Sequence, residues 1–312
     1  MPLFSIIIPT HNRAQLLKKA LDSALEQEWA DWELIVVDDG SEDNTKAVVN
    51  AYTDDRIQYC YQVHAERSSA RNRGIQMAKG QYLCFLDDDD YFLPKHLSIL
   101  QQHIAQHNFP IAVFRTGMRI DSGRERRYSK HFNEQEHSHP IPFFLKNMVG
   151  MHTLCFHQQC LQKQQFDERW WHFQDTHLLI RVLLDFPFYQ INAYTCVYVR
   201  HAAMGSAHAF LGKDAQARME NNLAAIRDLF EQGGKRMQQL MPSGMLDYML
   251  SEKYLGYAMG NLRVQNLPLS VQLFKKSLQH GKWHQGLKKK GLYLLRYTRA
   301  RIQKALHQGS GE

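Results

Sequence analysis

The stretch Tyr82-Leu-Cys-Phe-Leu-Asp-Asp-Asp-Asp-Tyr-Phe-Leu-Pro94 decides the fold. Its first five residues are apolar and favour β structure, so they predict a short buried strand over 82–86. Four carboxylates, Asp87 to Asp90, follow at the C-terminal end of that strand. Ligands of open α/β sheets bind in the crevice beyond the carboxyl ends of the strands, so these acids are expected to line a ligand site.

Adjacent carboxylates favour a cation between them. Two unit charges about 4 Å apart repel by roughly 4 kcal/mol at an effective dielectric constant of about 20. If strand alternation persists, Asp87 and Asp89 point to one face and Asp88 and Asp90 to the other. One pair would then hold Mg²⁺ or Mn²⁺, while its neighbours bond sugar hydroxyls or backbone amides. The alternative is a solvated acidic turn that helps to start a helix after Pro94.

The residues around this stretch alternate between strand and helix patterns. Strands are expected at 4–9, 33–38, 57–62 and 82–86, and helices at 14–28, 43–53, 67–78 and 94–106. Such alternation implies parallel βαβ units. Because parallel strands end at the same edge of a sheet, Thr10, Asp39 and Asp87 are expected at one rim.

After residue 106 the alternation is less regular. A strand at 111–116, a polar hairpin or mobile loop at 121–139, a short helix at 141–149, a strand at 152–156, a helix at 176–184 and one or two strands over 188–199 are expected. From about Phe210 the pattern is helical, with breaks at Gly233-Gly234, 266–268 and Gly281. We therefore expect an α/β domain over 1–208 and a helical region over 209–312.

Composition favours a globular protein. The 312 residues are 44% hydrophobic, and the chain has neither an apolar run of about eighteen residues nor a signal-peptide pattern at its start. The five scattered cysteines lack metal-site spacing, so a cytosolic protein with reduced thiols is expected. The net charge of +7 belongs to the tail: residues 271–312 carry ten basic groups and one acid, +9, which leaves −2 for 1–270.

Six separated motifs occur together in the chain. They are Ser5-Ile-Ile-Ile-Pro-Thr-His-Asn-Arg13, Val36-Val-Asp-Asp-Gly-Ser41, Ala70-Arg-Asn-Arg-Gly74, Phe85-Leu-Asp-Asp-Asp-Asp90, Phe166-Asp-Glu168 and Gln174-Asp175. In this order they resemble family 2 glycosyltransferases over about residues 3–205. The resemblance implies a GT-A fold, which is a Rossmann-like, mostly parallel sheet flanked by helices, here followed by a C-terminal helical appendage. Within 1–208, it implies a nucleotide-binding half, 1–106, and an acceptor-binding half, 107–208.

The resemblance also implies an activity. Such enzymes move a sugar from a nucleotide diphosphate donor, here expected to be a UDP-sugar, to an acceptor hydroxyl with inversion, in cell-surface or secreted glycan synthesis. The residues that it assigns to the donor are Pro9, Thr10, Arg13, Asp39, Arg67, Asp87 and Asp88. Asp39 would accept a hydrogen bond from the base, although Asp-Gly-Ser is also ordinary turn chemistry. Arg71 would instead pair with an acid of the rim, and each arginine has a surface ion pair as its alternative.

Metal and acceptor residues follow from the same resemblance. Asp89 and His201 would hold Mn²⁺ or Mg²⁺, which stabilises the departing diphosphate. Asp175 would be the catalytic base, or would only cap the helix at 176–184. Trp170 and Trp171 would stack on the acceptor sugar, or would belong to the core. Gln174 stands where the family usually has Glu, which leaves the acceptor undefined.

The basic tail has two interpretations. Residues 287–306 form an imperfect basic amphipathic helix, which either lies on an anionic membrane or packs on the protein. The expected acceptor is lipid-linked or an oligosaccharide, the expected location is the cytoplasm, with possible peripheral contact at the membrane, and no nucleic-acid partner is expected. Two rival functions stay open: a non-catalytic sugar-nucleotide-binding or scaffold subunit, and a nucleotidyltransferase. The second lacks the glycine-rich loop expected after the first strand.

Overall fold

The computed structural model describes residues 1–123, 125–136, 138–201, 215–281 and 287–309. The chain divides into two compact units, Met1–Ala202 and Ala203–Glu312. The boundary expected at 208/209 lies outside the described residues. The division of the first unit into halves at 106/107 stays a prediction.

The first unit contains one nine-stranded sheet. In the order β3-β2-β1-β4-β8-β6-β9-β5 neighbouring strands are hydrogen-bonded, and β7 pairs with β6 outside this path. The strands are β1 (Phe4–Thr10), β2 (Trp32–Asp39), β3 (Ile57–Gln62), β4 (Tyr82–Phe85), β5 (Tyr91–Phe92), β6 (Val113–Asp121), β7 (Arg126–Tyr128), β8 (Leu154–His157) and β9 (Phe188–Val199).

The first four strands are parallel, as predicted. Thr10 is in register with Asp38, and the β4 strand runs beside β1, so the C-terminal ends of β1, β2 and β4 share one rim. Antiparallel pairs occur in the rest of the sheet: β5 with β9, β7 with β6, and β8 with both of its neighbours. β8 lies between β4 and β6 and thereby joins the first part of the sheet to the second.

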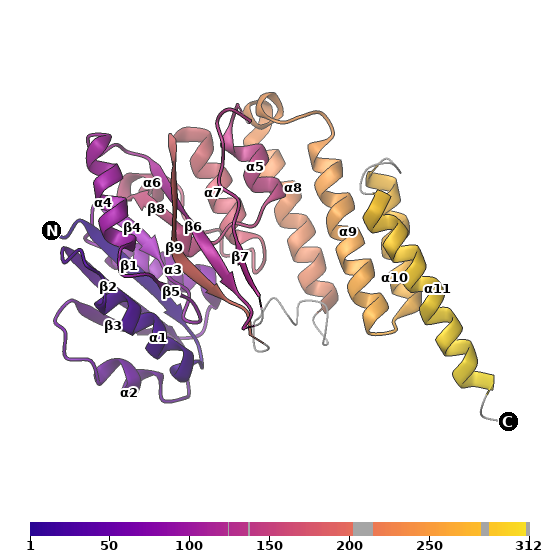
Figure 1. Ribbon diagram of the computed structural model, residues 1–312, viewed down its shortest axis with the longest axis horizontal. Helices are drawn as coiled ribbons and strands as arrows, with labels where there is room; N and C mark the ends of the chain where they lie inside the picture. The colour runs from indigo at the N-terminus through magenta and orange to yellow at the C-terminus, as the bar shows by residue number, and fades with distance from the viewer. Residues whose placement is uncertain (124, 137, 202–214, 282–286, 310–312) are drawn as a thin grey trace. The chain divides into compact units, whose positions relative to one another are not determined.

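Helices cover both faces of this sheet (Figure 1). On one face the core contains alternate residues of β1, Phe4, Ile6 and Ile8, together with Leu17 of α1 and Leu97 of α4. On the other face α3 lies against β1 and β2. The helices of this unit are α1 (Ala14–Leu25), α2 (Thr45–Asn50), α3 (Glu66–Met77), α4 (His96–Gln106), α5 (Pro140–Lys146), α6 (Gln158–Lys163) and α7 (Gln174–Asp185), with the 3₁₀ turn η1 (Met151–Thr153).

The predicted elements are present, with shifted ends. The sequence pattern missed α6 and β5, which are short and lack a hydrophobic period of their own. The polar segment 121–139 forms the hairpin of β6 and β7, followed by turns. Four of the five cysteines are buried and all five are free, as expected for core thiols.

The second unit is helical. It contains α8 (Ala215–Leu240), α9 (Met245–Arg263), α10 (Leu267–His280) and α11 (Leu287–Gly309), and α9 contacts each of the other three. Gly234 has φ 48° and ψ −136°, so the predicted break at Gly233-Gly234 is a kink within α8. Among the described residues, no helix combines the length and the apolar character that a membrane span requires.

Candidate active site

The four acids after β4 form a tight turn. The strand ends at Phe85, and the amide of Asp90 donates to the carbonyl oxygen of Asp87 over 3.1 Å. The expectation of strand-like alternation is therefore wrong, because the backbone turns at Asp88 and Asp89. The turn is not a solvated one either, since the side chains of Asp88 and Asp90 are buried.

Two of these acids share one arginine. Nη1 of Arg13 lies 3.0 Å from Asp88 Oδ1 and 2.9 Å from Asp89 Oδ2. The Thr10 hydroxyl donates to Asp88 Oδ2 over 2.8 Å. Burial raises the pKa of Asp88 to about 6, and the Arg13 guanidinium only partly offsets that effect. Thr10, Arg13 and Asp88 thus meet at the rim, as their shared assignment to the donor requires.

Asp89 also contacts the far end of β9. Its Oδ2 lies 3.1 Å from Nε2 of His201, two residues beyond that strand. The structure therefore brings together the two residues that were expected to hold a metal, from positions 112 residues apart. A carboxylate oxygen and an imidazole nitrogen are suitable ligands for Mn²⁺, so this donor set fits the ion.

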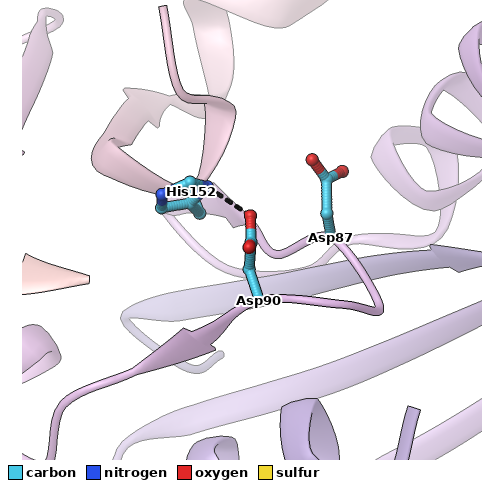
Figure 2. Close-up of side chains that lie close together, drawn as sticks. All are labelled: Asp87, Asp90 and His152. Carbon is cyan, nitrogen blue, oxygen red and sulfur yellow. Dashed lines mark ion pairs between the residues drawn. The ribbon is translucent and has the colours of Figure 1, made fainter. Parts of the chain in front are cut away.

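A second group of possible metal ligands was missed. Asp87, Asp90 and His152 have ligand atoms within 4.8 Å of one another. Figure 2 shows the three side chains and the ion pair between Asp90 and His152. His152 Nδ1 lies 3.0 Å from Asp90 Oδ2, and the other oxygen of Asp90 accepts from the Val199 amide. Burial would lower the pKa of His152, but the nearby carboxylates, above all Asp90, outweigh burial and raise it. No sequence spacing pointed to His152, because it lies 62 residues from Asp90 in an ordinary apolar segment.

A buried arginine connects the acidic turn to the expected base. Arg71 of α3 is 0% exposed, and its Nη2 and Nη1 each lie 2.6 Å from a carboxylate, those of Asp87 and Asp175. This confirms that Arg71 pairs with an acid of the rim. Burial alone would raise the pKa of Asp87, but Arg71, with a smaller effect from exposed Arg67, lowers it to about 2.

Asp175 occupies the second position of α7. The helix follows Phe173, whose φ of 68° is left-handed, and its first residue, Gln174, is buried. Asp175 therefore lies in the first turn, where a carboxylate is stabilised by the helix dipole. Helix capping alone does not explain its 2.6 Å contact with Arg71.

The two tryptophans differ in their environment. Trp170 is 8% exposed and packs near His177. The prediction that it stacks on the acceptor sugar is therefore wrong, and its alternative, a place in the core, holds. Trp171 is 46% exposed. Of the two tryptophans, Trp171 is therefore the one for which stacking on an acceptor sugar stays a prediction.

Asp39 lies at the C-terminal end of β2. Its Oδ1 accepts from Gln62 Nε2 at 2.7 Å and from the amide of Ala65 at 2.9 Å. The imidazoles of His11 and His64 stack beside it, with ring centres 4.2 Å apart. Pro9 is buried in β1 opposite Val37 and supports the rim through the backbone.

The family model of "Glycosyl transferase family 2" matches residues 5–168, which includes β1, the acidic turn and Phe166-Asp-Glu168. The chain belongs to glycosyl transferase family 2.

Other family members with related sequences come from several bacteria. This family 2 glycosyltransferase is 28% identical over 222 residues to WcaA of Escherichia coli K12, whose name assigns it to colanic acid biosynthesis; the match spans 65% of this chain and 75% of WcaA. It is 31% identical over 176 residues to a GalNAc(5)-diNAcBac-PP-undecaprenol β-1,3-glucosyltransferase of Campylobacter jejuni, covering 55% and 57% of the two chains.

Solved structures share the fold of this family 2 glycosyltransferase. Residues 1–349 of Staphylococcus aureus TarS, crystallised with UDP, superpose with a TM-score of 0.62 at 17% identity, over 98% of this chain and 91% of that one. The mannosyltransferase PcManGT of Pyrobaculum calidifontis, crystallised with GDP-Man and Mn²⁺, gives a TM-score of 0.58 at 17% identity, over 97% and 83%. These matches confirm the predicted GT-A fold.

Proposed function

We propose that this glycosyltransferase transfers a sugar from a UDP-sugar to an acceptor hydroxyl with inversion, and that Asp175 is its base. The observation that carries the proposal is the Asp87–Arg71–Asp175 bridge. One guanidinium fixes the distance between the acidic turn and the base. A base that is positioned opposite the leaving diphosphate would accept the proton of the attacking hydroxyl.

Asp89 and His201 would hold the divalent ion, Mn²⁺ or Mg²⁺. Its chemistry there would be to neutralise charge on the departing diphosphate, so that the leaving group needs no proton. Arg13 already contacts Asp88 and Asp89 and would add positive charge on the same side. Arg67, which is exposed in the first turn of α3 and close enough to Asp87 to lower its pKa, would contact a phosphate of the donor.

The assignment of UDP as the nucleotide is supported by Asp39. A carboxylate only accepts hydrogen bonds when ionised, so it favours a base with an N–H on its pairing edge, such as the imide of uracil. Guanine also offers such an N–H, and the similar structures include complexes with UDP, UDP-GlcNAc and GDP-Man. A comparison of UDP and GDP binding therefore tests the assignment.

Replacing Asp175 by Asn tests the mechanism. Asp175→Asn should bind UDP and Mn²⁺ like the wild type but turn over about 10²–10⁴-fold more slowly, because the proton acceptor is lost. Turnover is measured as UDP release from a panel of UDP-sugars. Asp54→Asn, which alters a carboxylate paired with Arg56 away from the rim, is the matched control and should leave turnover unchanged. Equal rates for Asp175→Asn and wild type would remove Asp175 from the reaction, and release of pyrophosphate in place of UDP would indicate a nucleotidyltransferase.

The proposed acceptor is a glycan linked to a lipid or a free oligosaccharide. The Campylobacter relative is named for an acceptor that carries PP-undecaprenol. On α11, Leu292 and Leu295 are exposed on the same side as exposed Arg296 and Arg299, whereas Tyr293 packs on Phe274. We propose that this side of α11 contacts an anionic membrane surface, gaining about 1 kcal/mol per basic group.

Vesicle sedimentation tests the membrane contact. The full chain should sediment with phosphatidylglycerol vesicles at low salt and be released as NaCl screens the charges. The double variant Leu292→Ser, Leu295→Ser should bind less, and Val264→Ser, an exposed apolar residue outside α11, should bind like the wild type. Equal binding to uncharged phosphatidylcholine vesicles, or none to either, would contradict the proposal.

A further inference from the structure

The carboxylate of Asp39 already has three partners from the protein. Gln62 and the Ala65 amide both donate to Oδ1. Nδ1 of His64 lies 2.8 Å from Oδ2 and 3.1 Å from the main-chain oxygen of the same residue. Oδ2 is therefore the oxygen that an incoming N–H would have to use, and His64 lies against it.

The backbone keeps His64 in this position. A Cβ at Gly40 would lie 2.7 Å from the amide nitrogen of His64, so only glycine allows this approach, and Gly40 also has φ +80°. Two residues further, Glu66 has φ 74°, a left-handed conformation that costs a non-glycine residue energy. The loop between β3 and α3 is thus closely packed at one end and strained at the other.

The side chain of His64 can nevertheless change its rotamer while the backbone stays in place. It is 48% exposed, whereas that of Asp39 is 4% exposed. Its ring is held by contacts that a rotamer change would break: the Asp39 carboxylate, the stacked ring of His11 at 4.2 Å, and Glu66, whose Oε1 lies 3.8 Å from Nε2. When a ligand requires Oδ2 of Asp39, the exposed imidazole can leave and the buried carboxylate cannot.

We propose that His64 competes with the nucleobase of the donor for Asp39 and must leave the carboxylate before the base can bind. This inference rests on the proposed function, because it takes the base to be one with an imide N–H. A protein group that occupies a ligand's site lowers the apparent affinity by the fraction of molecules in the competent state. His64 therefore weakens donor binding.

Calorimetric titration of UDP in the presence of Mn²⁺ tests the proposal on the full chain. His64→Ala should bind UDP about two- to fivefold more tightly than the wild type, the range expected for loss of a partly exposed ion pair. His280→Ala is the matched control, because His280 also pairs with an acid, Asp247, but in the helical unit; its Kd should equal that of the wild type.

Three results would overturn the inference. If His64→Ala binds UDP more weakly, His64 supports the base and does not compete with it. If its Kd equals that of the wild type, His64 and the base do not share Asp39. If wild type and variant, both folded by circular dichroism, fail to bind UDP and GDP with Mn²⁺, the proposed function itself fails and the inference with it.

Discussion

The guanidinium of Arg71 has no solvent contact and two carboxylate partners. Removing one member of such a buried group leaves the other charges without a partner. The protein then loses more stability than the intact group contributes as a net stabilisation. Lysine would retain the charge but not the two-pronged geometry.

Arg71→Lys should therefore separate positioning from binding. We expect a loss of turnover of about 10²-fold, because a displacement of roughly 1 Å at a reacting group has that effect, with UDP affinity nearly unchanged. Arg71→Ala should in addition lower the free energy of unfolding by about 3 kcal/mol. The measurements are UDP release, UDP titration and urea unfolding.

Arg127→Ala is the control for these variants. Arg127 pairs with Glu125 in the hairpin, and both side chains are largely exposed, so its loss should change the free energy of unfolding by less than about 1 kcal/mol. Full activity in Arg71→Lys would show that the bridge to Asp175 has no part in the reaction.

His96 gives a pH-dependent prediction. It is buried, its ring stacks on Phe92 with centres 4.0 Å apart, and Nδ1 lies 2.8 Å from Thr195 Oγ1. Burial lowers its pKa to about 3. The unfolded chain takes up this proton near pH 6.5 and the folded protein does not until about pH 3, so the contribution is complete above pH 6.5 and is lost as the pH falls.

Urea unfolding between pH 7 and pH 4 measures this loss. Below pH 6.5 the free energy of unfolding should fall by up to about 1.4 kcal/mol per pH unit because of His96. His96→Gln, which keeps a hydrogen-bonding group beside Thr195, should show a slope smaller by about one proton. Identical slopes would mean that His96 is protonated in the folded state.

At the scale of single residues, the sequence predicted which motifs lie together better than it predicted the direction in which their side chains point. Thr10, Asp39 and Asp87 were expected at one rim because parallel strands end there, and the Thr10 hydroxyl does bond to the acidic turn, at Asp88. The alternation of the four acids failed because the turn depends on a backbone hydrogen bond from Asp90 that local pattern does not reveal. His152 and His64 were missed because each is recognisable as a site residue only by its contact with a carboxylate that is distant in the sequence.

At the level of elements, two helical glycines have opposite surroundings, one in a packed interface and one on an exposed surface. Gly74 lies where α3 meets β1, and a Cβ there would be 2.4 Å from Cγ2 of Ile7. Gly256, on the exposed side of α9, would have no atom within 4 Å of an added Cβ. The same substitution should therefore have opposite effects at the two positions.

Gly74→Ala should lower the free energy of unfolding by about 1–3 kcal/mol, because it overpacks the interface between α3 and β1. Gly256→Ala should raise it by about 0.5–1 kcal/mol, because alanine favours the helix and narrows the unfolded ensemble. Urea titrations of both variants measure the difference. Stabilisation by both would show that α3 can move away from Ile7 without cost.

Element types were predictable where periodicity was long and uninterrupted, as in α1, α7 and the helices of the second unit. The parallel direction of the first four strands was predictable from the βαβ alternation, but their order was not, since β3 and β4 follow one another in the chain and are separated by β2 and β1 in the sheet. The position of β8 between β4 and β6 was not predictable either, because its four residues pair with partners about 70 and 40 positions earlier.

For the molecule as a whole, ligand binding should raise the free energy of unfolding. Any ligand that binds only the folded form adds about 2.7 kcal/mol when present at 100 times its Kd. UDP with Mn²⁺ should therefore raise the melting temperature, and Mn²⁺ should contribute nothing in Asp89→Asn. Asp55→Asn, which alters an exposed acid, should respond like the wild type. A Mn²⁺-dependent rise that survives in Asp89→Asn would place the ion elsewhere, with Asp87, Asp90 and His152 as the next candidates.

The position of β8 has a consequence for synthesis on the ribosome. Until Leu154–His157 has emerged, β4 has an unpaired edge made of Tyr82, Leu83, Cys84 and Phe85. At 5–20 residues per second, translating the intervening stretch takes about 4 to 14 seconds. During that interval a nascent chain exposes a short apolar β edge, the kind of template on which chains aggregate. Chaperone demand during expression should therefore be greatest before β8 is made and fall once it has paired.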